Sequence, residues 1–171
     1  MNDSVIPFAL LCFTSFFTLI NPLGTMPVFL SMTTGMTESE RKRIIMKATF
    51  VAFLIMISFT VFGQFLFQVF GLSTNGFRIA GGIVIMKIGY DMLQAHYTHI
   101  KLNEDEKIHF ADDISITPLA IPMLCGPGAI ANGIVLMEDA ETLLKKAILI
   151  FIIAFVFLIT ALILRTSTKL V

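Results

Sequence analysis

Four polar side chains that can hydrogen-bond a solute recur along the first apolar segment of this chain. They are spaced by four, three and four residues and are Thr14, Thr18, Asn21 and Thr25. That spacing places them on one stripe of an α-helix. Hydroxyl and amide groups on such a stripe either bind a polar solute or hydrogen-bond to neighbouring helices in a membrane. We favour the first interpretation, because a break in the backbone adjoins the stripe.

Prolines and a glycine interrupt the same segment where the stripe ends. Pro22 and Pro27 each remove a backbone donor, and Gly24 adds conformational freedom between them. In hydrocarbon, backbone groups that lose their helical partners are tolerated only where protein or a water-filled cavity receives them. The sequence therefore predicts a broken helix. We expect its second half to begin at Met26-Pro27, with Thr25 as the cap.

A second break lies in a later apolar segment, where Gly126 and Gly128 flank Pro127. Proline suits the first position of a new half-helix, since its missing N–H is no loss there. The N–H groups of Gly128, Ala129 and Ile130, with the positive end of the helix dipole, are then expected to receive a carboxylate. Two broken helices in corresponding places indicate the binding site of a membrane transporter.

Two amides near the breaks complete the expected site. Asn21 and Asn132 can contact the ammonium or carboxylate group of a ligand, or they can satisfy unwound backbone. We also expect the unwound carbonyls of Leu23 and Gly24 to face the ammonium group. The full set of expected binding residues is Thr18, Asn21, Pro22, Gly24, Thr25, Gly126, Pro127, Gly128, Ala129 and Asn132.

The elements that carry these residues are membrane spans. The 171 residues are 56% hydrophobic and 14% charged, whereas ordinary soluble domains carry roughly 25% charged residues. Segments long enough to cross a hydrocarbon core about 30 Å thick are 5–32, 44–70, 77–95, 114–137 and 147–164. The sequence therefore predicts an all-α, polytopic bundle of transmembrane helices in a lipid bilayer.

Lys and Arg are distributed unequally between the two sides of the predicted bundle. Eight fall in the loops of one side, which include 33–47, and three fall in the loops of the other. The positive-inside rule then places the N-terminus outside and 33–47 in the cytoplasm.

The two broken spans begin two similar halves of the chain. When Pro22 is aligned with Pro127, each break is followed by a cluster of basic residues and then by a long apolar helix. Because the first half holds three spans, its copy must enter the membrane in the opposite orientation. The predicted organisation is a three-helix repeat at 1–97, a polar cytoplasmic loop at 98–113, and an inverted repeat of two helices at 114–171. A sixth helix is missing, and we expect a truncated product.

Four motifs follow one another along the chain. They are Asn21-Pro-Leu-Gly-Thr-Met-Pro-Val-Phe, Phe77-Arg-Ile-Ala-Gly-Gly-Ile, Pro118-Leu-Ala-Ile-Pro and Gly126-Pro-Gly-Ala-Ile. Together they resemble the MarC family of bacterial and archaeal membrane proteins. The resemblance implies an inner-membrane protein whose six helices form two inverted three-helix repeats. For a few members it implies transport of small neutral amino acids such as glycine and alanine.

Charged residues of the third predicted span are candidates for ion coupling. Arg78 lies near the outer interface, where we expect it to anchor the span rather than bind substrate. Lys87 and Asp91 are four residues apart and are expected to compensate each other's charge, with proton coupling by Asp91 as the alternative. On the second span, Thr60 is expected to hydrogen-bond to another helix.

Other kinds of function are disfavoured by what the sequence lacks. A net charge of zero gives no reason to expect a nucleic-acid partner. The histidines all lie in or beside 98–113 and match no metal-ligand spacing. The sequence contains neither a Ser-His pair nor an HExxH motif that would indicate an enzyme. We predict no metal and no cofactor.

The sequence thus predicts a secondary transporter of a small neutral solute, which works by alternating access around the paired breaks. A channel and a membrane assembly protein that transports nothing are the alternatives. Saturable uptake would separate the transporter from the assembly protein. Whether the protein forms a homo-oligomer is left open.

Overall fold

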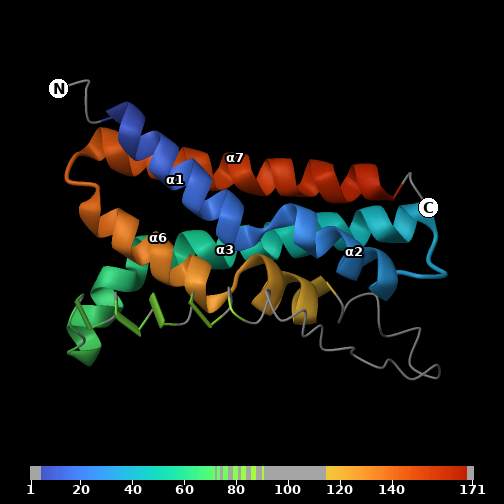
Figure 1. Cartoon of the computed structure of the whole chain (residues 1–171), viewed down its shortest axis with the longest axis horizontal. Coiled ribbons are helices and arrows are strands. Elements are labelled where there is room, and N and C mark those ends of the chain that lie inside the picture. The colour runs from blue at the N-terminus through green and yellow to red at the C-terminus, as the bar shows by residue number, and fades with distance from the viewer. Residues whose placement is uncertain are drawn as a thin grey trace.

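Helices make up the secondary structure of the part of the chain that the structure describes. The computed structural model describes residues 5–71 and 115–168, together with 73, 75–76, 79–80, 82–83, 86–87 and 90. The helices are α1 (Val5–Ile20), α2 (Pro22–Met32), α3 (Glu38–Phe70), η2 (Ser115–Leu124), α6 (Pro127–Asp139) and α7 (Leu143–Ser167) (Figure 1). No strand occurs among the residues that the structure describes. The predicted all-α membrane bundle is therefore confirmed.

Some predictions fall on residues outside this description. The third predicted span is described only at isolated positions, and neither Arg78 nor Asp91 is among them. The polar loop at 98–113 and all three histidines also lie outside. The anchoring and coupling roles and the division into two repeats therefore stay predictions.

Three helical segments within the described residues are long and apolar enough to cross a membrane, and they are Val5–Met32, Glu38–Phe70 and Leu143–Ser167. They agree with the first, second and fifth predicted spans. The fourth predicted span is divided into η2, of 10 residues, and α6, of 13 residues. Each piece alone is shorter than the roughly 20 residues that a crossing helix needs.

The long helix α3 begins at Glu38, earlier than the predicted start at 44. Thr37 caps it: its Oγ1 accepts a hydrogen bond from the N–H of Glu40 at 3.3 Å, and the Glu40 carboxylate accepts one from the N–H of Thr37 at 2.7 Å. This reciprocal capping box satisfies two donors that a helix start leaves unpaired. The basic residues at 41–43 and 47 therefore lie on the first turns of α3 and not in a loop.

One of these basic residues fixes the connection between α2 and α3. The side chain of Arg41 is buried, and its Nε donates a hydrogen bond to the carbonyl of Thr33 at 3.3 Å. Thr33 is the C-cap of α2. The cation therefore lies at the negative end of that helix, where it is stabilising.

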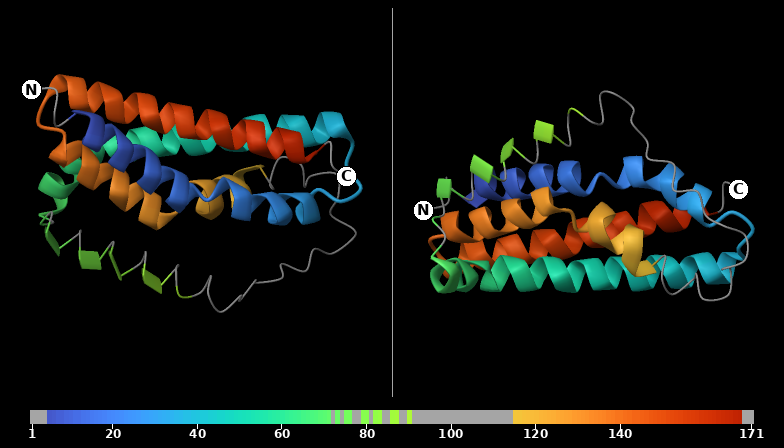
Figure 2. Two further views of the ribbon diagram at one scale, coloured as in Figure 1. Left: turned by 45° about the horizontal axis from the view of Figure 1, so that its top comes forward. Right: turned by 90° about the horizontal axis from the view of Figure 1, so that it is seen from below.

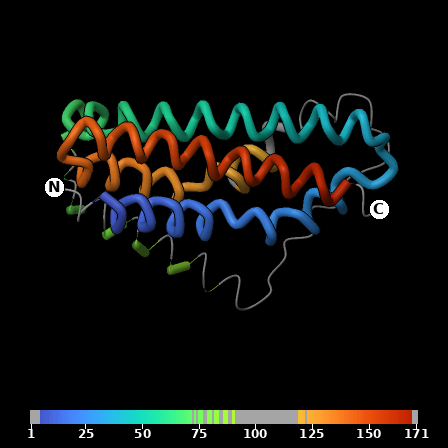
Figure 3. Tube along the Cα trace, turned by 90° about the horizontal axis from the view of Figure 1, so that it is seen from above, coloured from blue at the N-terminus to red at the C-terminus, as the bar shows by residue number. Residues whose placement is uncertain are grey.

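The two broken helices run in opposite directions through the bundle (Figures 1 and 2). α1 and α2 lead away from the N-terminal end, whereas η2 and α6 lead back toward it. α3 and α7 pack against each other and are likewise antiparallel (Figure 3). α3 also packs on η2 and α6, and α7 packs on α1 and α2. Each long helix thus supports the broken helix that lies in the other half of the chain.

Small residues allow these helices to approach closely. Ala48 and Ala52 of α3 are fully buried. A Cβ atom at Gly63 of α3 would lie 2.5 Å from a side-chain carbon of Ile134 on α6. Helices in membranes commonly associate through such positions, because van der Waals packing replaces the hydrophobic effect there.

Candidate functional site

The first break is a single residue wide and is centred on Asn21. This residue has φ 45° and ψ 63°, in the left-handed region, and it is the only non-glycine residue with positive φ in the described ranges. Its Oδ1 accepts a hydrogen bond from the N–H of Gly24 at 3.1 Å. Asparagine tolerates this conformation because its short side chain can bond locally. The side chain of Asn21 therefore satisfies a backbone donor at the start of α2.

The second half of this helix begins earlier than the sequence predicts. α2 starts at Pro22, directly after the break, and Pro27 lies inside it. Thr25 is not the cap, since its N–H and its hydroxyl both donate to the carbonyl of Asn21 at 3.0 Å. The predicted start at Met26-Pro27 is wrong because Pro22 already has the φ that a first helical position needs. The side chain of Asn21 then supplies the cap.

A carbonyl without its usual helical donor lies at the end of α1. Pro22 has no N–H to offer the carbonyl of Thr18. This carbonyl lies earlier in the chain than the predicted ones, since Leu23 and Gly24 lie inside α2.

The second break combines a π-helix, a bend and a new helix start. At the end of η2, the N–H of Cys125 in the bend bonds to the carbonyl of Ala120 at 2.9 Å, five residues back. Gly126 is extended, with φ −77° and ψ 162°, and it offers no side-chain cap. Pro127 is the first residue of α6, as the sequence predicts.

The start of α6 presents fewer donors than expected. The N–H of Ile130 bonds to the carbonyl of Gly126 at 3.1 Å, so it is not available to a ligand. In every α-helix the carbonyl of the N-cap residue, here Gly126, accepts the first hydrogen bond of the helix. The N–H groups of Gly128 and Ala129 precede that bond and have no partner within the helix. Both residues are buried.

A polar contact joins the two broken helices. The Nδ2 of Asn132 on α6 donates a hydrogen bond to Oγ of Ser15 on α1 at 3.1 Å. Around this contact lies an open depression of about 340 Å³. Its lining residues are Thr14, Ser15, Thr18, Leu19 and Asn132. Two predicted binding residues from different halves of the chain, Thr18 and Asn132, therefore share one site.

The other predicted binding residues do not line this depression. They are Asn21, Pro22, Gly24, Thr25, Gly126, Pro127, Gly128 and Ala129. Conversely, Ser15 lines it and is not among the predicted residues. Its hydroxyl lies three residues before Thr18, a spacing that brings side chains together on a helix and could have identified it.

A buried hydroxyl lies beside this site. Oγ1 of Thr60 on α3 has no hydrogen-bond partner among the described residues, although the side chain is fully buried. The predicted bond to another helix is therefore not present there. The hydroxyl faces Gly133 of α6, where a Cβ atom would overlap it and would lie 3.6 Å from Phe16 of α1. Three helices meet at this point, next to Asn132.

Comparison with known proteins agrees with the predicted family. A model described as MarC family integral membrane protein matches residues 6–171. A UPF0056 membrane protein of Methanocaldococcus jannaschii is 35% identical over 165 residues, which are 95% of this chain and 72% of that protein. No solved structure matches.

Bacterial relatives are also similar. The UPF0056 membrane protein YvbG of Bacillus subtilis is 43% identical over 123 residues, which are 70% of this chain and 58% of that protein. The UPF0056 membrane protein YhcE of Escherichia coli is 40% identical over 126 residues, which are 72% of this chain and 58% of that protein. The matched region thus spans less than two thirds of either bacterial relative.

Proposed function

This chain belongs to the MarC family of integral membrane proteins, and from that premise we propose that it is a secondary transporter of small neutral solutes. The proposed substrates are small neutral amino acids such as glycine and alanine. The proposed mechanism is alternating access around the two helix breaks. The proposed location is the inner (plasma) membrane, with the N-terminus outside.

Matching positions in the two halves support an inverted repeat. Pro22 and Pro127 each begin the helix that follows a break. Fifteen residues later, Thr37 and Thr142 each cap the next long helix by accepting a hydrogen bond at 3.3 Å from the N–H three residues on. The corresponding helices run in opposite directions, as an inverted repeat requires (Figure 1).

The observation that carries the proposal is the bond between Asn132 and Ser15 at an open depression. Transporters of this kind bind solutes between discontinuous helices that belong to different repeats. The depression lies between two such helices, and its lining includes three hydroxyl groups and an amide. The hydroxyls of Thr14 and Ser15 donate to carbonyls of α1, so they offer a solute acceptor oxygens. These groups suit a small polar solute.

The chemistry of the lining favours an amino acid with an uncharged side chain. The carbonyl of Thr18, which Pro22 leaves without its helical donor, would accept a hydrogen bond from an ammonium group. Nδ2 of Asn132 carries a second hydrogen that can bond a carboxylate, and the positive end of α6 is about one turn away. Among the residues that the structure describes, no charged side chain lines the depression. A charged substrate side chain would therefore lie unpaired in a membrane, which is unfavourable.

Uptake into proteoliposomes tests this proposal. We expect saturable uptake of labelled glycine and alanine, with competition by the unlabelled amino acids and none by lysine or glutamate. Protein-free liposomes give the background. Uptake that rises linearly with concentration would indicate a channel, and no uptake of any small neutral amino acid would favour an assembly protein; either result would overturn the proposal.

A further inference from the structure

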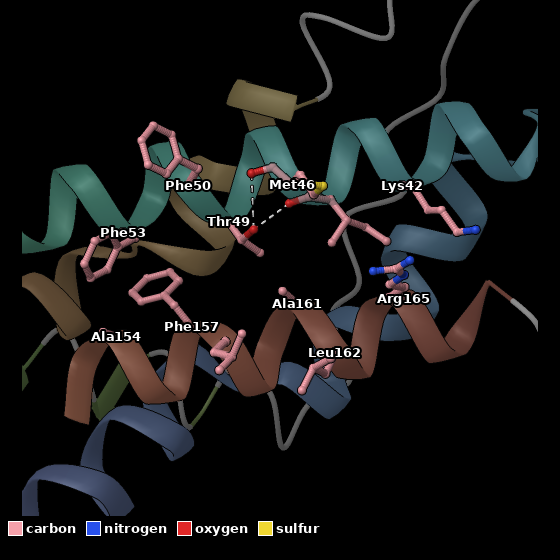
Figure 4. Close-up of a pocket in the computed structure, with 12 residues that line it drawn as sticks. Lys42, Met46, Thr49, Phe50, Phe53, Ala154, Phe157, Ala161, Leu162 and Arg165 are labelled. Carbon is pink, nitrogen blue, oxygen red and sulfur yellow. Dashed lines mark hydrogen bonds between the residues drawn. The ribbon is translucent and has the colours of Figure 1, made fainter. Parts of the chain in front are cut away.

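A second cavity lies between α3 and α7, away from the depression at Asn132 (Figure 4). It is a groove of about 450 Å³, a size within the usual range of ligand sites, roughly 300–1,000 Å³. Lys42 of α3 and Arg165 of α7 lie at one end of it, and Phe53 and Phe157 lie toward the other (Figure 4). The groove therefore has a charged mouth and an aromatic deep end.

The walls of this groove offer hydrocarbon rather than hydrogen bonds. Apart from the two cations, Thr49 is the only polar residue that lines it within the described ranges. The hydroxyl of Thr49 is already used, since it donates to the carbonyls of Ile45 at 2.7 Å and Met46 at 3.3 Å (Figure 4). A polar solute would lose its hydrogen bonds to water in such a groove. A hydrocarbon chain would lose none.

The length of the groove corresponds to one leaflet of a bilayer. Lys42 and Phe53 lie about 16 Å apart along a helix that rises about 1.5 Å per residue. Half of a hydrocarbon core about 30 Å thick is about 15 Å. The rings of Phe53 and Phe157 pack edge to face, 5.9 Å apart between centroids, where the two helices meet deep in the groove. A chain that enters at the cations would therefore end near the middle of the membrane.

The charge at the mouth favours an anion. Five basic residues, Arg41, Lys42, Arg43, Lys47 and Arg165, lie at this end of α3 and α7, with two acidic residues, Glu38 and Glu40. Both carboxylates have partners, and one of these partners is Lys42 of the groove.

Glu38 pairs with Lys42 at 2.6 Å, and Glu40 bonds to Thr37. Arg165 forms no ion pair with any residue that the structure describes. Its guanidinium is free to bond an anion at two points.

We propose that this groove binds an anionic phospholipid. One acyl chain lies along Phe50 and the pair of phenylalanine rings, and the phosphate is held mainly by Arg165, because Glu38 already pairs with Lys42. Basic sites between transmembrane helices bind such head groups on the cytoplasmic side of membranes. The proposal does not depend on transport, because the groove and the depression at Asn132 have no lining residue in common among the described residues.

The absence of tryptophan from the chain makes a direct test simple. A tryptophan introduced as Phe50→Trp reports from the groove, and one introduced as Phe62→Trp reports from another part of α3, where the native side chain is equally exposed at 61%. Each variant is reconstituted into phosphatidylcholine vesicles that contain a minor fraction of brominated phosphatidylglycerol or of brominated phosphatidylcholine. Bromine quenches tryptophan fluorescence on contact.

We expect brominated phosphatidylglycerol to quench Phe50→Trp more strongly than brominated phosphatidylcholine does. At Phe62→Trp we expect the two brominated lipids to quench equally. Adding Arg165→Gln should reduce the preference at Phe50→Trp about fivefold, since one basic residue near an anionic lipid surface contributes about 1 kcal/mol. Arg165→Lys should keep most of the preference. Lys146→Gln, at the opposite end of α7, should keep all of it.

Two results would overturn the proposal. Equal quenching of Phe50→Trp by both lipids would show that the groove holds any lipid without head-group recognition. Weak quenching by both, which falls further as the protein concentration in the vesicles rises, would show that a second copy of the chain covers the groove. High salt should weaken the preference in the native background, because ions screen exposed charges.

Discussion

Nδ2 of Asn132 lies 3.1 Å from Oγ of Ser15, although 117 residues separate them in the sequence. The bond joins the second part of one broken helix to the first part of the other. Hydrogen bonds between membrane helices contribute on average only about 0.6 kcal/mol to stability. The contact therefore matters more for where it places two polar groups than for the stability it provides.

We predict that Asn132→Ala raises the KM for uptake of alanine about tenfold or more. A lost hydrogen bond to a charged ligand group costs roughly 1.5–3 kcal/mol, which corresponds to this change in affinity. The thermal unfolding temperature in mild detergent should change little. Ser58→Ala is the control, because that hydroxyl is exposed and bonds to the carbonyl of Leu54 in its own helix. An Asn132→Ala protein with the KM of the control would exclude Asn132 from the site.

We predict that Asn21→Ala destabilises the protein by about 2 kcal/mol, whereas Asn21→Gly costs only a few tenths. Alanine loses the cap on Gly24 and is strained at φ 45°, and each effect is worth about 1 kcal/mol. Glycine accepts the left-handed conformation without strain. Unfolding by a denaturing detergent would measure both variants. Equal stability of the two would mean that the left-handed conformation of residue 21 is not strained by alanine.

We predict that Gly133→Ala destabilises the bundle by about 1–3 kcal/mol, because the new methyl group overlaps the hydroxyl of Thr60. Thr60→Ala should restore the lost stability, since the nearest remaining side-chain atom, Cβ of Thr60, would be 3.5 Å away. Thr60→Val should not restore the stability, because valine keeps a methyl group in the place of the hydroxyl.

A double-mutant cycle in the same unfolding assay measures this coupling. The outcome that contradicts the packing is additive behaviour of Gly133→Ala and Thr60→Ala.

We predict that the connection between α2 and α3 faces the cytoplasm and that the connection between α6 and α7 faces outward. Thr34→Cys and Glu141→Cys are both at exposed positions. In a Cys12→Ala, Cys125→Ala background, an impermeant thiol reagent applied to intact cells should label only Glu141→Cys. The native cysteines are buried and can be replaced by the smaller alanine. Labelling of Thr34→Cys from outside would invert the orientation.

The two breaks can be predicted from sequence because a proline lacks an N–H in every context. The first residue of the helix that follows each break is harder to predict. Pro127 begins α6 as expected, but the choice between Pro22 and Pro27 depends on whether Asn21 adopts the left-handed conformation. That conformation costs about 1–2 kcal/mol for most residues, and hydrophobic patterns carry no information about it.

A hydropathy pattern likewise locates the residue at which a helix enters the membrane. It does not locate the first residue of the helix, which can lie earlier. The segment from 44 onward is apolar, yet α3 starts at Glu38. The spacing of Thr37 and Glu40 is that of a capping box and would have identified the start. Local signals of this kind complement a hydropathy pattern.

The sequence predicts a polar site beside the helix breaks, but it does not predict all of the residues that line the site. Thr18 and Asn132 each stand out as polar residues beside a break. Ser15 lies about 100° around the helix axis from Thr14. A stripe defined from Thr14 therefore does not include it. The spacing of three residues between Ser15 and Thr18 places both on one side of the helix, but that α1 meets α6 there is a tertiary relation.

The single-residue break at Asn21 gives α2 the geometry of a lever. Its 11 residues make an arm about 16 Å long, whose direction relative to α1 is set by the two backbone dihedrals of one residue. A rotation of about 10° at that pivot moves the far end of such an arm by about 3 Å. The far end is Thr33, whose carbonyl is bonded to Arg41 of α3. A swing at the pivot therefore either breaks this bond or drags the first turns of α3 along with it.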